Sequence, residues 1–238
     1  MCSLKVVESH LMDNCKLTEV INNEISQGVI KSAEEASDWV KGTFLFRRIQ
    51  SNPLMYGMNG NGDEAIHSFV LEKCTQSIQQ LRKVNAISME EDGTVTPAAG
   101  CHIMSRHFID FETMKSIVEL PHDSGPLQLL KMLSRCGKMQ SPVRRNEKKP
   151  LNEAHKMIKY KLDGPPSKVR IQAPYEKVFV LLQAAIGQHY FQDFSLRQEM
   201  SAAIDGASRS EYKCLDHCSN QAESLDFFYF RCSFFSLV

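Results

Sequence analysis

The sequence predicts a mostly α-helical protein that contains one short β-hairpin. Apolar residues recur at spacings of three and four over several long segments, which is the period of an amphipathic helix. Asp92-Gly93 lies between two short runs that alternate in polarity, and this is a strong hairpin signal. The 238 residues are enough for one large domain or two small ones.

A long amphipathic helix is predicted over residues 32–56. Ser32 and Glu35 have the spacing of a capping box, and Pro53 forbids continuation of the helix. The stripe includes the only tryptophan of the chain, so we expect this helix to anchor a core. The residues expected along the stripe are Ala36, Trp39, Val40, Thr43, Phe44, Phe46 and Ile49.

Two further helices and the hairpin complete a first domain. A helix is predicted over residues 17–25, ended by Gly28, and a third helix runs from Asp63, expected as its cap, to about residue 85. The hairpin follows over residues 87–96. Three helices and then a hairpin are the pattern of a winged-helix domain, which we place at residues 14–99. The stripe expected on the third helix is Ile66, Phe69, Val70, Cys74, Ile78 and Leu81.

Residues 100–209 are predicted to form a helical bundle. Helices are expected at residues 111–119, 126–136, 151–160 and 175–188, the last of them fully buried. A final amphipathic helix is expected over residues 193–209, with Phe194, Leu196, Met200, Ala203, Ile204 and Ala207 inward or partly so. Residues 210–238 show no periodicity and are expected to be a divergent, disordered tail.

The charges are balanced in number but unevenly distributed. The chain has 28 basic and 28 acidic residues, so its net charge indicates no class of partner. Residues 138–170 nevertheless hold ten basic and three acidic side chains. Such a block is typical of a polyanion contact and equally of a solvated loop. Eight cysteines without a framework spacing indicate reduced thiols, and no apolar run reaches the roughly 18 residues of a membrane span.

Several strings resemble the large superfamily-two DExH helicases, most closely the Ski-like meiotic crossover branch in its plant form. Glu8 opens an E-S-x-L string, and Trp39 and Asn52 open W-V-K-G-T-F-L-F-R-R-I and N-P-L-x-Y-G. Later signatures are Gly100, Ser105, Phe108-Ile109 and Thr113-Met114, then Arg144-Arg145-Asn146-Glu147, then the Lys-x-x-x-Leu-Leu-Gln-Ala string that starts at Lys177.

The resemblance implies the C-terminal part of an ATP-dependent 3′-to-5′ nuclear DNA helicase that promotes meiotic crossover formation. Residues 1–13 would be a remnant of the connection from the motor, residues 14–99 the winged helix, and residues 100–209 a truncated ratchet bundle, or Sec-sixty-three homology region. Implied partners are single-stranded or branched DNA, recombination proteins and the helicase motor domains. ATP and Mg²⁺ are cofactors of the full-length family, and we expect no cofactor in this chain.

Catalytic signatures are absent from the sequence. No G-x-x-x-x-G-K-[ST] string occurs, so we do not expect this polypeptide alone to hydrolyse ATP. The string Asp63-Glu64-Ala65-Ile66-His67 only superficially resembles a helicase box, because it opens a predicted helix without a preceding strand. No metal site is predicted, although Cys214, His217, Cys218 and Cys232 carry zinc-binding atoms at irregular spacing.

The candidate nucleic-acid contacts lie on the last helix and in the basic block. In the family that the sequence resembles, a helix at this point lies along the single strand, and its long or polar members here are Arg197, Gln198, Ser201 and Arg209. Such side chains stack on bases or contact the sugar-phosphate backbone. An electrostatic funnel is expected from Arg144, Arg145, Lys148 and Lys149.

Three alternatives to this hypothesis follow from the same residues. Arg197 and Arg209 would simply face water if the last helix contacted no strand. An acid-rich first half favours a winged-helix scaffold that binds other proteins. An RNA helicase of the same superfamily would contain the same two domains.

Overall fold

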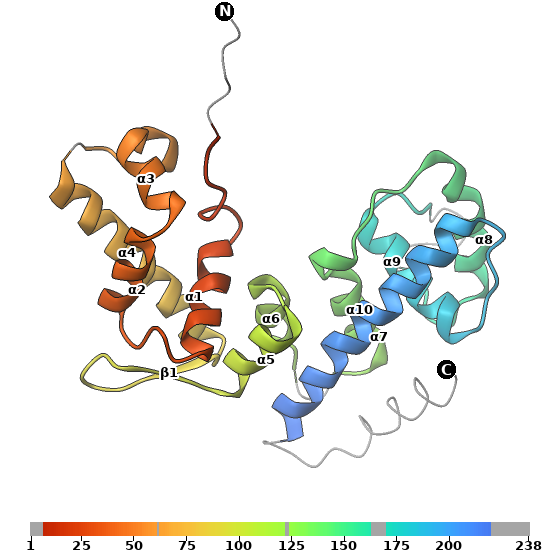
Figure 1. Ribbon diagram of the computed structural model, residues 1–238. Coiled ribbons are helices and arrows are strands. Elements are labelled where there is room, and N and C mark those ends of the chain that lie inside the picture. Colours follow the sequence, from red (N-terminus) through yellow and green to blue (C-terminus); the bar gives the residue numbers. More distant parts are fainter. Residues whose placement is uncertain (1–6, 61, 122–123, 163–169, 220–238) are drawn as a thin grey trace, which may run out of the picture. The chain divides into compact units, whose positions relative to one another are not determined.

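Helices make up most of the protein in the computed structural model, which describes residues 7–60, 62–121, 124–162 and 170–219 (Figure 1). The chain divides into two compact units after Val118. Within the described residues, the only strands form one two-stranded sheet. The predicted fold class, mostly α with a single hairpin, is therefore confirmed.

The first unit contains the predicted winged helix and two further helices. Its elements are α1 (Lys16–Ser26), α2 (Ala33–Lys41), α3 (Phe44–Ser51), the 3-10 helix η1 (Pro53–Tyr56), α4 (Asp63–Lys83), β1 (Ile87–Met89), β2 (Val95–Pro97), α5 (Ala99–His107) and α6 (Phe111–Val118). The helices expected at residues 17–25, 63–85 and 111–119 are confirmed to within two residues at each end. Asp63 is the first residue of α4 rather than its cap, which is Gly62.

The core of this unit is formed by apolar faces of α1, α2, α4 and α5. α1 packs against α4 and α5, and α2 packs against α4. Ile21, Val40 and Leu81 are completely buried at these contacts. The hairpin is antiparallel with Ile87 opposite Pro97, and the backbone N–H of Val95 donates to the carbonyl of Lys31 at 2.7 Å. This last bond ties the hairpin to Lys31, two residues before the start of α2.

The single helix predicted over residues 32–56 was wrong, because the chain breaks between α2 and α3. Thr43 is extended (φ −94°, ψ 163°), and its hydroxyl donates to the carbonyl of Val40 at 2.7 Å. A threonine hydroxyl that binds nearby backbone competes with the helix, and the preceding Gly42 favours helix poorly. The break shifts the phase of the stripe, so that Phe44 is 54% exposed while Leu45 is buried.

The start and end signals of that region are confirmed. The hydroxyl of Ser32 accepts from the N–H of Glu35 at 3.2 Å, and the Glu35 carboxylate accepts from the N–H of Lys31. The first bond satisfies one of the N–H groups that a helix start leaves unpaired, and the second satisfies the N–H of the residue before the cap. α3 ends at Ser51, two residues before Pro53, as the proline requires.

The second unit is built around α9 (Pro174–Ile186), which packs against α7, α8 and α10. The other elements are α7 (Pro126–Arg135), the 3-10 helices η2 (Gly137–Met139) and η3 (Arg145–Glu147), α8 (Lys148–Met157) and α10 (Phe194–Ser219). Residues 178–182 and 184 of α9 are all at most 1% exposed, which confirms the expected burial for the middle of this helix. Full burial over residues 175–188 was wrong, because Tyr175 is 37% exposed and residues 187 and 188 are exposed.

Some predicted limits differ from those of the structure. α8 starts three residues before the helix expected at residues 151–160, and α10 continues to Ser219, ten residues into the predicted tail. Residues 220–238 lie outside the described residues.

The compact units divide after Val118, so α5 and α6 belong to the unit of the winged helix, although the predicted domain boundary lies between residues 99 and 100. The domain ranges therefore stay predictions.

Glu8 attaches the segment before α1 to α3 and η1. Arg48 donates to both carboxylate oxygens of Glu8, from Nε at 3.0 Å and from Nη2 at 2.7 Å. Tyr56 donates its hydroxyl to Glu8 at 2.9 Å and accepts the N–H of Ser9, and Asn52 donates to Glu8 at 3.3 Å. The E-S-x-L and N-P-L-x-Y strings of the sequence thus meet in one hydrogen-bonded cluster, the Glu8 cluster.

The Glu8 cluster makes this attachment sensitive to acid. The hydrogen bond from Arg48 is the largest influence, and with Tyr56, Asn52 and the Arg48 charge it outweighs the opposing effect of burial and lowers the pKa of Glu8 to about 2. A carboxyl whose pKa is lower in the folded chain contributes stability above its unfolded pKa, and this contribution disappears as the pH falls through the folded pKa.

We therefore expect the Glu8→Gln variant to melt at a lower temperature than the wild type at neutral pH. The difference should shrink as the pH falls from about 5 to about 2, because Glu8 becomes protonated over this range. Thermal unfolding followed by circular dichroism at several pH values measures it, with Glu91→Gln at the exposed hairpin turn as the control. A difference between wild type and Glu8→Gln that does not change with pH would contradict the expectation.

Candidate nucleic-acid interface

A buried ion network holds α10, the helix that carries most of the predicted contacts. The Lys177 ammonium on α9 lies 2.7 Å from the Glu147 carboxylate, and both side chains are completely buried. Lys177 also pairs with Glu199 on α10. Glu199 in turn accepts from the Ser141 hydroxyl at 3.1 Å and pairs with Arg144. Two cations and two carboxylates from three parts of the second unit are thus neutralised together.

The charges of the network stabilise one another. Burial opposes ionisation of Glu199, but Lys177, Ser141 and Arg144 together outweigh it and lower the pKa of this carboxyl. Burial likewise disfavours the charge of Arg144, and the Glu147 and Glu199 carboxylates outweigh it and raise the pKa of the guanidinium. Arg144 Nε lies 2.6 Å from Glu147. Arg144, predicted as a nucleic-acid contact, is therefore already engaged with carboxylates inside the protein.

The family signatures of the second unit are explained by this packing. Glu147 ends the Arg-Arg-Asn-Glu string and Lys177 begins the Lys-x-x-x-Leu-Leu-Gln-Ala string. Gln183, in the same string, accepts from the N–H of Tyr160 at 2.9 Å and donates to its carbonyl at 3.1 Å. Sequence reasoning missed these pairings, although a lysine at the start of an otherwise apolar buried helix was a signal that it needs an acidic partner.

Arg197 lies at the centre of an aromatic cluster at the start of α10. Its Nη1 donates to the Tyr190 hydroxyl at 2.7 Å and to the Phe191 carbonyl at 2.9 Å. The guanidinium lies 5.0 Å from the Tyr190 ring centre and 5.7 Å from that of Phe194. Arg197 thus does more than face water, because it holds the loop before α10 and lies against two rings.

The two rings of this cluster are open to solvent. Tyr190 is 71% and Phe194 62% exposed. The prediction that Phe194 points inward was wrong, because the buried side of α10 is formed by Leu196, Ala203 and Ala207, and Phe194 lies off that side. Exposed aromatic faces beside an arginine provide a stacking surface for bases without a sequence preference. Sequence reasoning missed Tyr190, and its spacing of seven residues from Arg197 carried no signal.

The other predicted residues of α10 are partly described. Gln198 and Ser201 are exposed, one and four residues after Arg197. Residues four apart lie on the same side of a helix, so Arg197 and Ser201 share a face. Arg209 is part of α10, but its side chain lies outside the described residues. Further along α10, Gly206 packs closely against Met139, because a Cβ at Gly206 would lie 2.7 Å from Met139 Cγ.

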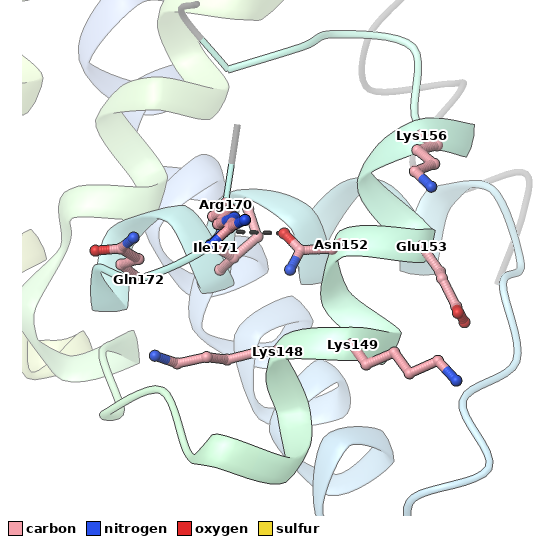
Figure 2. A pocket seen from close by; sticks show the side chains of 8 residues that line it. All are labelled: Lys148, Lys149, Asn152, Glu153, Lys156, Arg170, Ile171 and Gln172. Atoms are coloured by element: carbon pink, nitrogen blue, oxygen red, sulfur yellow. Dashed lines mark hydrogen bonds between the residues drawn. The ribbon is translucent and has the colours of Figure 1, made fainter. Parts of the chain in front are cut away.

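The remaining basic residues lie on η3 and α8. Arg145 is exposed on η3, and Lys148 and Lys149 are exposed at the start of α8. These two lysines are on a helix and not in a solvated loop, and they line a pocket together with residues of the segment before α9 (Figure 2). The predicted funnel thus consists of Arg144, which is ion-paired although its side chain is 46% exposed, and three exposed cations that form no ion pair among the described residues.

Among the residues whose side chains the structure describes, no group of three or more His, Cys, Asp or Glu side chains is arranged to hold a metal ion. The side chains of Cys214, His217, Cys218 and Cys232 lie outside that part of the chain. Among the helices that the structure describes, none combines the length and the apolar character of a membrane span.

Comparison with known proteins identifies both domains. Residues 97–227 match the Sec63 Brl domain, and residues 8–91 match the SNRNP200-type winged helix-turn-helix domain. The chain is 30% identical to mouse "Probable ATP-dependent DNA helicase HFM1" over 81% of this chain and 14% of the relative. It is also 30% identical to the rice "ATP-dependent DNA helicase MER3 homolog", over 89% of this chain and 18% of the relative.

A third relative belongs to a differently named group. Mouse "Activating signal cointegrator 1 complex subunit 3" is 28% identical over 90% of this chain and 10% of the relative. The chain spans less than a fifth of each of these three proteins. The predicted winged helix and Sec-sixty-three region, and the kinship with Ski-like helicases, are confirmed. The plant meiotic type is not distinguished, since the animal and plant relatives are equally similar.

We expect Lys177→Met to lower the free energy of unfolding by about 3–5 kcal/mol, because it leaves a buried carboxylate without its main partner. Adding Glu147→Gln should recover part of this loss, since it removes the buried negative charge. Urea unfolding of the two variants measures both effects, with Lys83→Met, an exposed lysine on α4, as the control. Equal stability of Lys177→Met and wild type would show that the network contributes nothing to folding.

Proposed function

Because the chain belongs to the family of proteins that contain a Sec63 Brl domain, we propose that it is the C-terminal, strand-guiding part of an ATP-dependent 3′-to-5′ DNA helicase. Two relatives with 30% identity are named as DNA helicases, which supports this assignment. The proposed parent protein acts in the nucleus, in meiotic recombination and crossover formation, as the resemblance of the signature strings implies. Recombination proteins are its proposed partners there, and single-stranded or branched DNA is its proposed substrate.

The stacking surface of Tyr190, Arg197 and Phe194 is the observation that carries the proposed role. Two exposed rings next to one guanidinium offer flat faces and a positive charge at one end of α10. Gln198 and Ser201 continue the exposed surface along the helix with groups that bind phosphate and sugar oxygens. Contacts of this kind are tolerant of sequence, as a translocating enzyme requires.

We propose that the chain by itself is not catalytic. Its sequence has no phosphate-binding loop, so ATP and Mg²⁺ would bind to motor domains of the parent protein. The Glu8 cluster supports a connection of this kind, because it anchors the segment before α1 to the winged helix through Arg48. The winged helix would then brace the motor, and α10 would guide the strand.

Two other functions have specific support. The relative named as a subunit of the activating signal cointegrator 1 complex covers this chain as fully as the DNA helicases do, so the match does not single out the DNA helicases. An RNA helicase of the same superfamily is therefore the first alternative. The exposed carboxylates Glu90, Glu91 and Asp92 at the hairpin turn disfavour phosphate contact by the wing and favour a scaffold that binds protein. The first alternative predicts a preference for RNA, and the second predicts no salt-dependent strand binding.

We expect the full chain to bind a fluorescently labelled single DNA strand, and Phe194→Ala to weaken that binding by about five- to a hundredfold. This range corresponds to the roughly 1–3 kcal/mol of one lost base stack. Fluorescence anisotropy at several salt concentrations measures it. The affinity should fall with salt in both proteins with the same slope, because the substitution removes no charge.

Phe44→Ala is the matched control, since Phe44 is a similarly exposed phenylalanine on α3. Phe194→Ala is a cleaner test than Arg197→Ala, which would also release the loop carbonyl of Phe191. Equal effects of the two phenylalanine substitutions, or no binding by folded protein, would refute the proposed role of α10. The same assay with an RNA strand of identical sequence decides between the DNA and RNA branches.

A further inference from the structure

A basic pocket of about 480 Å³ lies between α8 and the segment that leads into α9 (Figure 2). Six of its eight lining residues carry side-chain hydrogen-bond donors, namely Lys148, Lys149, Asn152, Lys156, Arg170 and Gln172. Glu153 is the one carboxylate among the lining residues that the structure describes. Four cationic side chains and two amides around one space favour a ligand that is negatively charged and has acceptor atoms on several sides.

The helix arranges some of these donors in a row. Lys148 and Asn152 are four residues apart on α8, so they lie on one side of it about 6 Å apart along the axis. Figure 2 shows Lys148 and Lys149 extending in opposite directions from the start of α8, and the Asn152 side chain directed toward the Arg170–Gln172 segment. The pocket therefore has donors on both of its walls.

Asn152 fixes the two walls relative to each other. Its side-chain oxygen accepts from the N–H of Ile171 at 3.0 Å, which attaches the segment with Arg170 and Gln172 to α8. Because the amide oxygen is used in this bond, the amide nitrogen is left as a donor. The polar wall is thus held in place by the protein itself and does not need a ligand to form.

The position of the lysines is unfavourable for α8 alone. The first turn of α8 has no acidic residue and starts with Lys148 and Lys149, where the helix dipole favours negative charge. The carboxylate of Glu147, the N-cap of α8, is already paired with Lys177 and Arg144. In the described structure, no carboxylate forms an ion pair with either lysine. At the other end of α8, by contrast, Lys161 donates to the carbonyls of His155, Lys156 and Ile158, as the dipole favours. A bound anion would offset the unfavourable charge at the start of the helix.

We propose that this pocket binds phosphate groups, either those of a nucleic-acid strand or those of a small polyphosphate. Phosphate combines a compact negative charge with several acceptor oxygens, and lysine, arginine and a helix N-terminus bind it in the same way in both kinds of ligand. The inference does not depend on the proposed role of α10, because the pocket shares no residue with the stacking surface.

Titration calorimetry of the full chain with inorganic tripolyphosphate tests the proposal. We expect binding that weakens about a hundredfold in Lys148→Gln/Arg170→Gln, since each of the two lost charge-assisted hydrogen bonds corresponds to roughly a tenfold change in affinity. Arg82→Gln/Lys83→Gln removes the same two charges from an exposed part of α4 and should bind like the wild type. All four side chains are exposed, so circular dichroism should show folded proteins.

Loss of tripolyphosphate binding in both double variants would mean that net charge alone is responsible, and would overturn the proposal. Absence of binding to the wild type would overturn it as well. The source of the phosphate is decided by strand binding: displacement of the DNA strand by tripolyphosphate, with weaker strand binding in the pocket variant, supports a strand site. Tripolyphosphate binding without either effect supports a small polyphosphate. Phe194→Ala should leave tripolyphosphate binding unchanged, so failure of the strand-guiding role can be recognised separately.

Discussion

The buried contact between Lys177 and Glu147 is the interaction on which the second unit depends. Neither side chain reaches solvent, so each charge would be costly without the other. Their position at the junction of η3 and α9 forces these two segments to meet in one register. Glu199 joins the same network from α10, and this orients the helix whose outer surface carries the stacking residues.

The basic residues of the second unit fall into two groups, those that bind acceptors within the protein and those that are exposed without an ion pair. Arg144 and Lys177 are neutralised by carboxylates, and Lys161 binds the carbonyls at the end of α8. Lys148 and Arg170 are exposed at the pocket beside α8 and form no ion pair within the part of the chain that is described. The basic residues of this part of the sequence thus contribute in the fold to a structural ion network and to an accessible positive surface.

In the first unit, a cluster of hydrogen bonds holds the segment before α1 against α3 and η1. Glu8 receives hydrogen bonds from Arg48, Asn52 and Tyr56, which lie at intervals of four residues in the sequence. α3 and η1 together place these three donors on one surface, although a continuous helix was expected there. The break at Thr43 therefore changes the burial of Phe44 and Leu45, but it leaves the polar surface that binds Glu8 intact.

Local chemistry in the sequence determined most of the secondary structure of this protein. The Ser32 cap, the Pro53 stop, the Asp92-Gly93 turn and the apolar run of α9 act within a few residues, so their effects could be predicted from order and spacing. The tertiary structure alone decided which charges pair, since Glu147 and Lys177 are 30 residues apart and the cost of burying each depends on the other. It also decided that Tyr190 and Phe194 are exposed beside Arg197, and that α8 and the Arg170 segment line an open pocket. Burial and long-range pairing are properties of packed surfaces, and periodicity within a single helix does not contain them.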